Sequence, residues 1–161
     1  MQTKDLVYGA LLTALSLLIP ITFGAYLRVL IPPFSATLAS HVPVMISMLI
    51  NPLVALLVGA GSALGFLFIM GPVIAARAAV HMLFGVLGAI MIKKGRSFQS
   101  TLLITAPIHA LGEALIVLPF GFNLYQGLYV VGLGTLLHHG IDALITLLLV
   151  KILKYGFLMG R

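Results

Sequence analysis

The chain has 161 residues, of which 61% are hydrophobic and only 7% are charged. Soluble domains carry about 25% charged residues, so this composition excludes a soluble enzyme or a soluble binding domain. The formal net charge of +6 does not indicate a nucleic-acid-binding protein, because the basic residues flank apolar runs and form no continuous stripe. We therefore predict a single integral membrane domain over residues 1–161.

Six apolar segments predict transmembrane helices, each of which needs roughly 20 residues to cross a bilayer. The apolar runs are continuous, which excludes the alternating strands of a membrane barrel. The predicted fold class is thus an all-α membrane protein, a six-transmembrane-helix bundle. The second segment is short and contains Pro43, and the sixth is longer than one crossing requires. The predicted spans are approximately 4–23, 35–50, 52–70, 72–92, 98–118 and 126–154.

The basic residues predict the orientation of the bundle. Only Arg28 lies on the side that follows the first span, and Arg77 lies inside a span. Positive charge accumulates in cytoplasmic loops, so we predict that both termini face the cytoplasm. The residues on that side are Lys4, Lys93, Lys94, Arg96, Lys151, Lys154 and Arg161.

Arg77 stands inside the apolar stretch 71–92, where an arginine costs roughly 2.5–3.5 kcal/mol on insertion scales. At about 1.5 Å per helical residue, it lies roughly 7.5 Å below the external turn at Gly71, and His81 follows one turn deeper on the same face. The same reasoning places polar residues of other segments in the outer half of the bilayer. Ionisable residues in membranes usually face a bundle interior or a water-filled cavity, so we predict a pocket open to the outside. The predicted binding residues are Arg77, His81, His41, Glu113, His109, Asn123, Tyr125, Tyr129 and His138.

These residues also have purely structural interpretations. In one such interpretation, Arg77 and Glu113 form a simple ion pair between two spans. Each histidine is then a hydrogen-bonding residue between helices, and Asp142 with its neighbours His138 and His139 is a buried cluster that fixes packing.

Small residues at intervals of four predict close helix contacts. In the first span these are Ala10 and Ala14, for which packing and docking onto another membrane protein are equal alternatives. For the third span we predict packing within the bundle, through Ala55, Gly59, Ala63, Gly61 and Gly65.

Missing motifs restrict the function further. The chain has no G-x-x-x-x-G-K-[ST] loop, so it cannot hydrolyse ATP, and it has no H-E-x-x-H or G-x-S-x-G motif. One unduplicated bundle is also small for a carrier built from two repeats. A pocket without a source of energy predicts a binding subunit, not an enzyme. The alternatives are a small membrane metalloenzyme that uses the histidine and carboxylate cluster, and a stand-alone channel or proton-coupled carrier.

The whole chain resembles the substrate-binding S components of the energy-coupling factor (ECF) vitamin transporters of prokaryotes. The resemblance rests on six spans, both ends inside, the "ALLTA" stretch of the first span and a long first external loop. The stretches "IPPFSATLASHVPVMISMLINPLVALLVGAGSALGFLF" and "ARAAVHMLFGVLGA" are most similar to the niacin branch. The pantothenate and hydroxymethylpyrimidine branches are close competitors.

The resemblance implies a high-affinity subunit of an ECF-type ABC importer in the cytoplasmic membrane of a prokaryote, which captures a small water-soluble vitamin at the external face. It implies a transmembrane coupling protein and two ABC ATPases as partners. Those partners use ATP, so no cofactor is expected in this chain. Ala10 and Ala14 match the alanines that dock onto the coupling protein. The start "MQTKD" lacks the Met-His terminus of the nickel and cobalt branch, so no metal site is predicted.

Overall fold

The computed structural model describes residues 2–159 of the chain. Of the basic residues used to predict orientation, Arg161 lies outside the described residues, as does the side chain of Lys154. The elements are α1 (Thr3–Leu27), β1 (Arg28–Ile31), β2 (Phe34–Thr37), α2 (Val42–Ser47), α3 (Pro52–Ile69), α4 (Pro72–Lys93), α5 (Phe98–Ile116), a 3₁₀ turn η1 (Leu118–Phe120), a π-helical segment η2 (Gln126–Gly132) and α6 (Leu133–Met159).

Five helices among the described residues are long and apolar enough to cross a membrane. They correspond to all the predicted spans except the second, so the mostly helical membrane architecture is confirmed and the six-helix count is not. The fifth predicted span continues from α5 into η1, and the sixth begins in η2. The five membrane-length helices are Thr3–Leu27, Pro52–Ile69, Pro72–Lys93, Phe98–Phe120 and Gln126–Leu153.

The predicted second helix over residues 35–50 is wrong. The segment begins in β2, which pairs antiparallel with β1, and only the six residues of α2 are α-helical. Pro43 has no backbone N–H and fits only the first turn of a helix, which is where α2 places it. A new helix, α3, then begins after Asn51, whose side chain accepts a hydrogen bond from the Val54 N–H at 2.9 Å.

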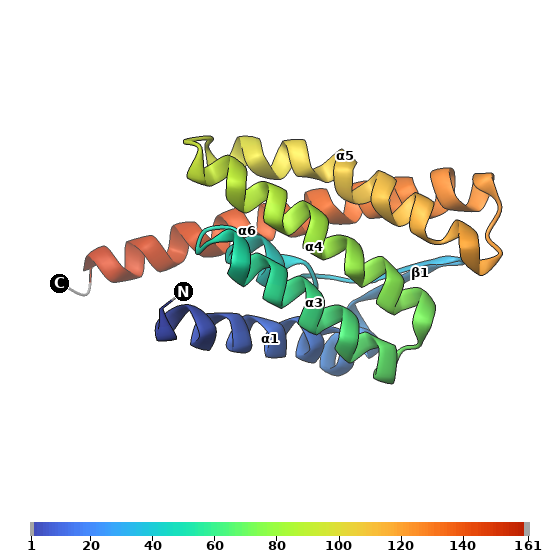
Figure 1. The fold of residues 1–161 in the computed structure, drawn as a ribbon, viewed down its shortest axis with the longest axis horizontal. Coiled ribbons are helices and arrows are strands. Elements are labelled where there is room, and N and C mark those ends of the chain that lie inside the picture. The colour runs from blue at the N-terminus through green and yellow to red at the C-terminus, as the bar shows by residue number, and fades with distance from the viewer. Residues whose placement is uncertain (1, 160–161) are drawn as a thin grey trace.

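Both termini lie at the same end of the bundle, and the β1–β2 hairpin lies at the other end (Figure 1). β2 and α2 together return the chain from the hairpin to the start of α3, in place of the predicted helix. The loop between α4 and α5, which follows Lys93, lies at the end with the termini, whereas Arg28 begins β1. The basic residues near the N-terminus and after α4 are therefore separated along the long axis from Arg28, as the orientation argument requires.

The small residues of α3 pack against two neighbouring helices. A Cβ atom built on Gly59 would lie only 2.6 Å from the backbone nitrogen of Met82 in α4. A Cβ atom on Gly65 would lie 2.6 Å from side-chain carbons of Leu17 in α1. The predicted packing of the third span within the bundle is confirmed.

The apolar core borders the cluster of buried histidines at Phe84 and Leu102. The core surrounds α2 and uses the beginning of α3, the end of α4 and the beginning of α5, all of which lie toward the termini. Its fully buried members include Met45, Val54 and Phe84. Toward the hairpin the buried groups include Arg77, whose side chain reaches the Ser35 carbonyl oxygen of β2.

Candidate binding cavity

A cavity of about 900 Å³ lies between α1, the hairpin, α3 and α4. Its lining runs from the hairpin and the α3–α4 turn, at the end opposite the termini, to Ser16, Ser62 and His81. Pockets for small ligands measure roughly 300–1,000 Å³, so this cavity has room for a small solute. Four of the predicted binding residues line it, namely Arg77, His81, His41 and Glu113.

Arg77 lies in the second turn of α4 and connects three elements. Its Nε donates a hydrogen bond to Glu113 Oε2 at 2.8 Å, and its Nη2 lies 2.7 Å from the same oxygen. Its Nη1 donates to the backbone carbonyl oxygen of Ser35 in β2 at 3.1 Å, and the guanidinium lies over the ring of Phe34. A guanidinium has more N–H groups than these contacts use, so both terminal nitrogens keep a donor for a ligand.

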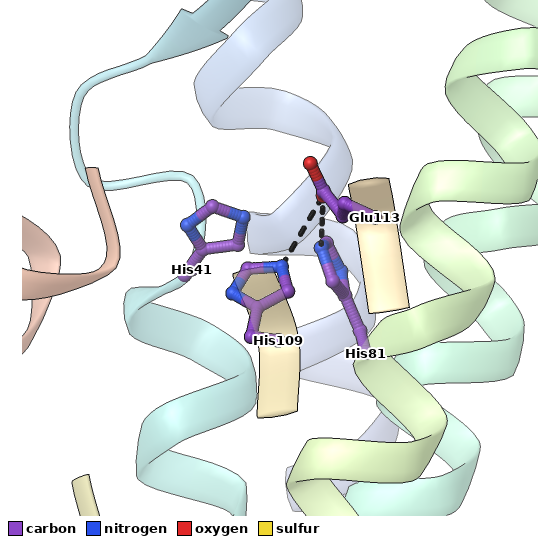
Figure 2. A group of neighbouring side chains, drawn as sticks. All are labelled: His41, His81, His109 and Glu113. Carbon is purple, nitrogen blue, oxygen red and sulfur yellow. Dashed lines mark hydrogen bonds and ion pairs between the residues drawn. The ribbon is translucent and has the colours of Figure 1, made fainter. Parts of the chain in front are cut away.

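Glu113 is buried in α5 and joins the polar groups of several helices. Its Oε2 accepts from Arg77 and from the Thr135 hydroxyl of α6, the latter at 2.6 Å. Its Oε1 lies 3.2 Å from His109 Nε2 and 3.9 Å from His81 Nε2, as the dashed lines in Figure 2 show. A buried carboxylate is tolerated only when it is paired and hydrogen-bonded, and Glu113 meets both conditions. The ion pair that the structural interpretation required is therefore present, and it also lines the cavity.

Asp142 of α6 holds the turn that carries His41. Its two oxygens accept hydrogen bonds from the backbone N–H groups of Ala39 at 2.7 Å and His41 at 2.9 Å. Ala39 has a φ of 67°, a left-handed conformation that costs a non-glycine residue roughly 1–2 kcal/mol. The carboxylate compensates for this strain and places the His41 ring against the cavity.

The His41 ring itself has an unusual polar environment. Its Nδ1 lies 3.1 Å from Asp142 Oδ2, within ion-pair distance, yet the angles do not allow a hydrogen bond. Among the described residues this buried nitrogen therefore has no hydrogen-bond partner. His138 approaches the same Asp142 oxygen at 3.3 Å and Ser40 Oγ at 3.2 Å.

All five histidines of the sequence gather in one cluster behind and beside Glu113. The ring of His41 lies at its centre, 4.6 Å from the rings of His109 and His138 and 4.8 Å from that of His81. His109 in turn contacts His139, with 3.1 Å between the two Nδ1 atoms. His109 and His138 do not line the cavity, so they reach its wall only through Glu113 and His41.

Besides His109 and His138, three more predicted binding residues do not line the cavity. Asn123 and Gln126 exchange hydrogen bonds between their side chains and backbone N–H groups at the start of η2. Tyr125 and Tyr129 are 66% and 62% exposed and stack on each other. Their rings face outward from the bundle and away from the cavity.

The two alanines predicted to dock onto the coupling protein are exposed on α1. Ala10 and Ala14 lie on a different face from Gly9, Leu12 and Ser16, which are buried against the bundle. This exposure leaves the docking prediction open.

Sequence reasoning missed the contribution of α1 and α3 to the cavity, which includes Ser16, Pro20, Ser62 and Phe66. The Ser16 hydroxyl donates to the Thr13 carbonyl oxygen and the Ser62 hydroxyl to that of Gly59. Serines in membrane helices commonly bond back to their own helix in this way, so the presence of a serine in the sequence does not by itself indicate a binding site.

The cluster contains donor atoms of the types that bind transition metals. One donor atom from each of His41, His81, His109 and Glu113 lies within 4.8 Å of the others. Donor atoms of a tetrahedral zinc site are roughly 3.3 Å apart, given Zn–N distances of about 2.0–2.1 Å. A closed metal shell would require these side chains to move together, and the absence of a resident metal stays a prediction.

Comparison with known proteins identifies the family. No family model matches the chain, and no solved structure matches it significantly. The chain is 36% identical over 173 aligned positions to "Niacin transporter NiaX" of Lactococcus lactis subsp. cremoris (strain MG1363), covering 97% of this chain and 77% of that protein. This chain belongs to the niacin-transporter family of ECF S components.

Membership of this family confirms the resemblance found in the sequence. It also fits the five membrane-length helices, so the chain is a multi-pass membrane protein of a transport family. The relative of this family is named for transport and not for a reaction that it catalyses.

Proposed function

We propose that this protein is the high-affinity binding subunit of an ECF-type ABC importer and captures niacin at the external face of a prokaryotic cytoplasmic membrane. A transmembrane coupling protein and two ABC ATPases complete the importer and use ATP, so this chain has no cofactor and catalyses no reaction. The observation that carries the proposal is the similarity to a niacin transporter over 97% of the chain, combined with a buried arginine in the wall of a cavity.

The side chains of the cavity match the chemistry of niacin, a pyridine ring with a carboxylate. The free N–H groups of Arg77 bind the carboxylate as a bidentate pair, which lysine cannot do. Glu113 neutralises Arg77 when the site is empty, at 2.7 Å. A ring N–H of His41 or His81 donates to the pyridine nitrogen, and Phe66 offers an apolar surface to the ring.

The same chemistry ranks the alternative ligands. Pantothenate has a carboxylate for Arg77 but no aromatic ring, and hydroxymethylpyrimidine has a ring but no carboxylate. Both stay as alternatives for the same transport role, below niacin. A metalloenzyme would need at least three of the clustered donor atoms to converge on one ion.

The test is calorimetric titration of the purified, ligand-free protein with nicotinate, nicotinamide, pantothenate and hydroxymethylpyrimidine. We expect nicotinate to bind tightest. Arg77→Lys keeps the charge beside Glu113 but loses the bidentate contact, and a hydrogen bond to a charged group contributes roughly 1.5–3 kcal/mol. The Kd should therefore rise at least about tenfold.

The matched control is Arg96→Lys, an exposed arginine whose side chain donates a hydrogen bond to the Ser100 hydroxyl at 3.4 Å. It should bind nicotinate like the wild type. An unchanged Kd in Arg77→Lys, or a wild-type protein that binds pantothenate and not nicotinate, would contradict the proposal. Uptake is tested in proteoliposomes, where transport should require the coupling protein and its ATPases.

A further inference from the structure

Four groups form an unbranched chain of hydrogen bonds behind the cavity wall. His139 Nε2 lies 3.1 Å from the Leu102 carbonyl oxygen, and His139 Nδ1 lies 3.1 Å from His109 Nδ1. His109 Nε2 lies 3.2 Å from Glu113 Oε1. Both histidines have an exposed fraction of 0%, so solvent cannot supply a missing donor or acceptor.

The donors and acceptors of this chain can be assigned in order. A carbonyl oxygen only accepts, so His139 Nε2 carries a hydrogen. A neutral His139 then accepts at Nδ1, and His109 must donate from its own Nδ1. A neutral His109 would therefore present a lone pair at Nε2 to an ionised Glu113 oxygen, which also only accepts. With neutral histidines and an ionised glutamate, the chain is one proton short.

We propose that this chain holds one additional proton and that His109 thereby makes the site selective for an anionic ligand. The proton has three possible places, on His109, His139 or Glu113, and each gives the same total charge. The guanidinium of Arg77, 2.7 Å from Glu113, stabilises the ionised carboxylate and so favours the proton on the His109 ring. Arg77, Glu113 and the two histidines together then carry a net charge of +1.

The other charged and titratable groups around His109 do not cancel this charge at the cavity. Asp142 is fully buried and does not line the cavity, and its oxygens accept the backbone N–H groups of Ala39 and His41. His109 contacts the rings of His81, His41 and His139, and it bonds to Glu113. Arg77 and His138 lie one contact further away, against Glu113 and His41 respectively.

This inference rests on the proposed function and narrows its ligand. Nicotinate carries a negative charge, whereas its amide, nicotinamide, carries none and has almost the same shape. A wall with an excess positive charge favours the acid over the amide, while the ring contacts serve both equally. His109 touches neither ligand and acts through Glu113, so it is a positioning residue for charge.

Two variants separate the proton from the hydrogen bond. In His109→Gln the side-chain amide still donates to Glu113 but carries no charge. In the control, His139→Asn, the amide oxygen replaces Nδ1 as the acceptor and leaves the proton on His109. We expect His109→Gln to lower nicotinate affinity at least about tenfold and to leave nicotinamide affinity within about twofold. His139→Asn should keep the wild-type ratio between the two ligands.

Nuclear magnetic resonance of protein labelled with ¹⁵N-histidine detects the proton directly, without any ligand. The two ring nitrogens of an imidazolium have similar chemical shifts, whereas those of a neutral ring are far apart. One imidazolium that disappears in His109→Gln is the expected result.

The inference is overturned if all five histidines are neutral at pH 7, if His109→Gln weakens both ligands equally, or if a metal ion copurifies and occupies the gap between His109 and Glu113. Failure of the proposed function looks different. In that case the wild type binds no nicotinate, while the imidazolium signal remains.

Discussion

Replacing Asp142 with asparagine tests how the protein positions His41. The carboxylate accepts the N–H groups of Ala39 at 2.7 Å and His41 at 2.9 Å. In Asp142→Asn the side chain keeps one oxygen, which can accept only one of these two backbone N–H groups. The NH₂ group that replaces the other oxygen faces the second N–H and cannot accept from it. The turn before α2 then loses one of its two anchors, and Ala39 keeps its strained left-handed conformation.

The size of the effect follows from these contacts. A hydrogen bond to a charged acceptor contributes roughly 1.5–3 kcal/mol, and a buried donor without a partner costs roughly 1–3 kcal/mol. The free energy that keeps the turn ordered should fall by roughly 2–3 kcal/mol. A ligand that needs the ordered turn must compensate for this loss, and each 1.4 kcal/mol is about tenfold in affinity. We expect the Kd for nicotinate to rise about 30-fold to 140-fold.

Calorimetric titration of the purified variant measures this Kd. Thr146→Val is the control, because Thr146 lies one turn away on the same helix and bonds to the Asp142 carbonyl oxygen instead of the turn. It should bind like the wild type. Adding Ala39→Gly to Asp142→Asn removes about 1 kcal/mol of strain and should recover roughly fivefold in affinity. A wild-type Kd in Asp142→Asn would refute the idea that this carboxylate positions His41.

Three further predictions concern other parts of the molecule. Gly59→Ala places a methyl group 2.6 Å from the Met82 backbone nitrogen and should lower the free energy of unfolding by roughly 1–3 kcal/mol, measured by thermal unfolding. The control Gly140→Ala places its methyl group in open space and should leave the stability of the protein unchanged. Equal stability of the two variants would contradict the packing argument. Ala14→Phe, on the exposed face of α1, should bind nicotinate normally but lose uptake when the coupling module is supplied; normal uptake would remove Ala14 from the docking surface. Tyr129→Ala should change the nicotinate Kd less than about twofold, because the ring does not line the cavity; a large loss would return it to the binding site.

The sequence by itself determined the membrane class, the approximate limits of five of the helices and the shared level of Arg77 and Glu113 along neighbouring helices. Insertion of Arg77 into hydrocarbon is so costly that the arginine has to face a partner or a cavity. Helical periodicity then places His81 beneath it, and the rise per residue brings Glu113 to a similar level. These are local constraints, and they hold wherever the neighbouring helices pack.

Only the tertiary structure decided what depends on contacts between distant segments. Residues 35–50 are apolar enough for a helix, but Pro43 and the pairing of β2 with β1 replace it with a strand and a short helix. The rotation of η2 turns Tyr125 outward, and no local pattern reports that rotation. The bond between His109 and His139 joins two helices through residues 30 positions apart, so their shared proton follows from packing and from nothing in either helix alone.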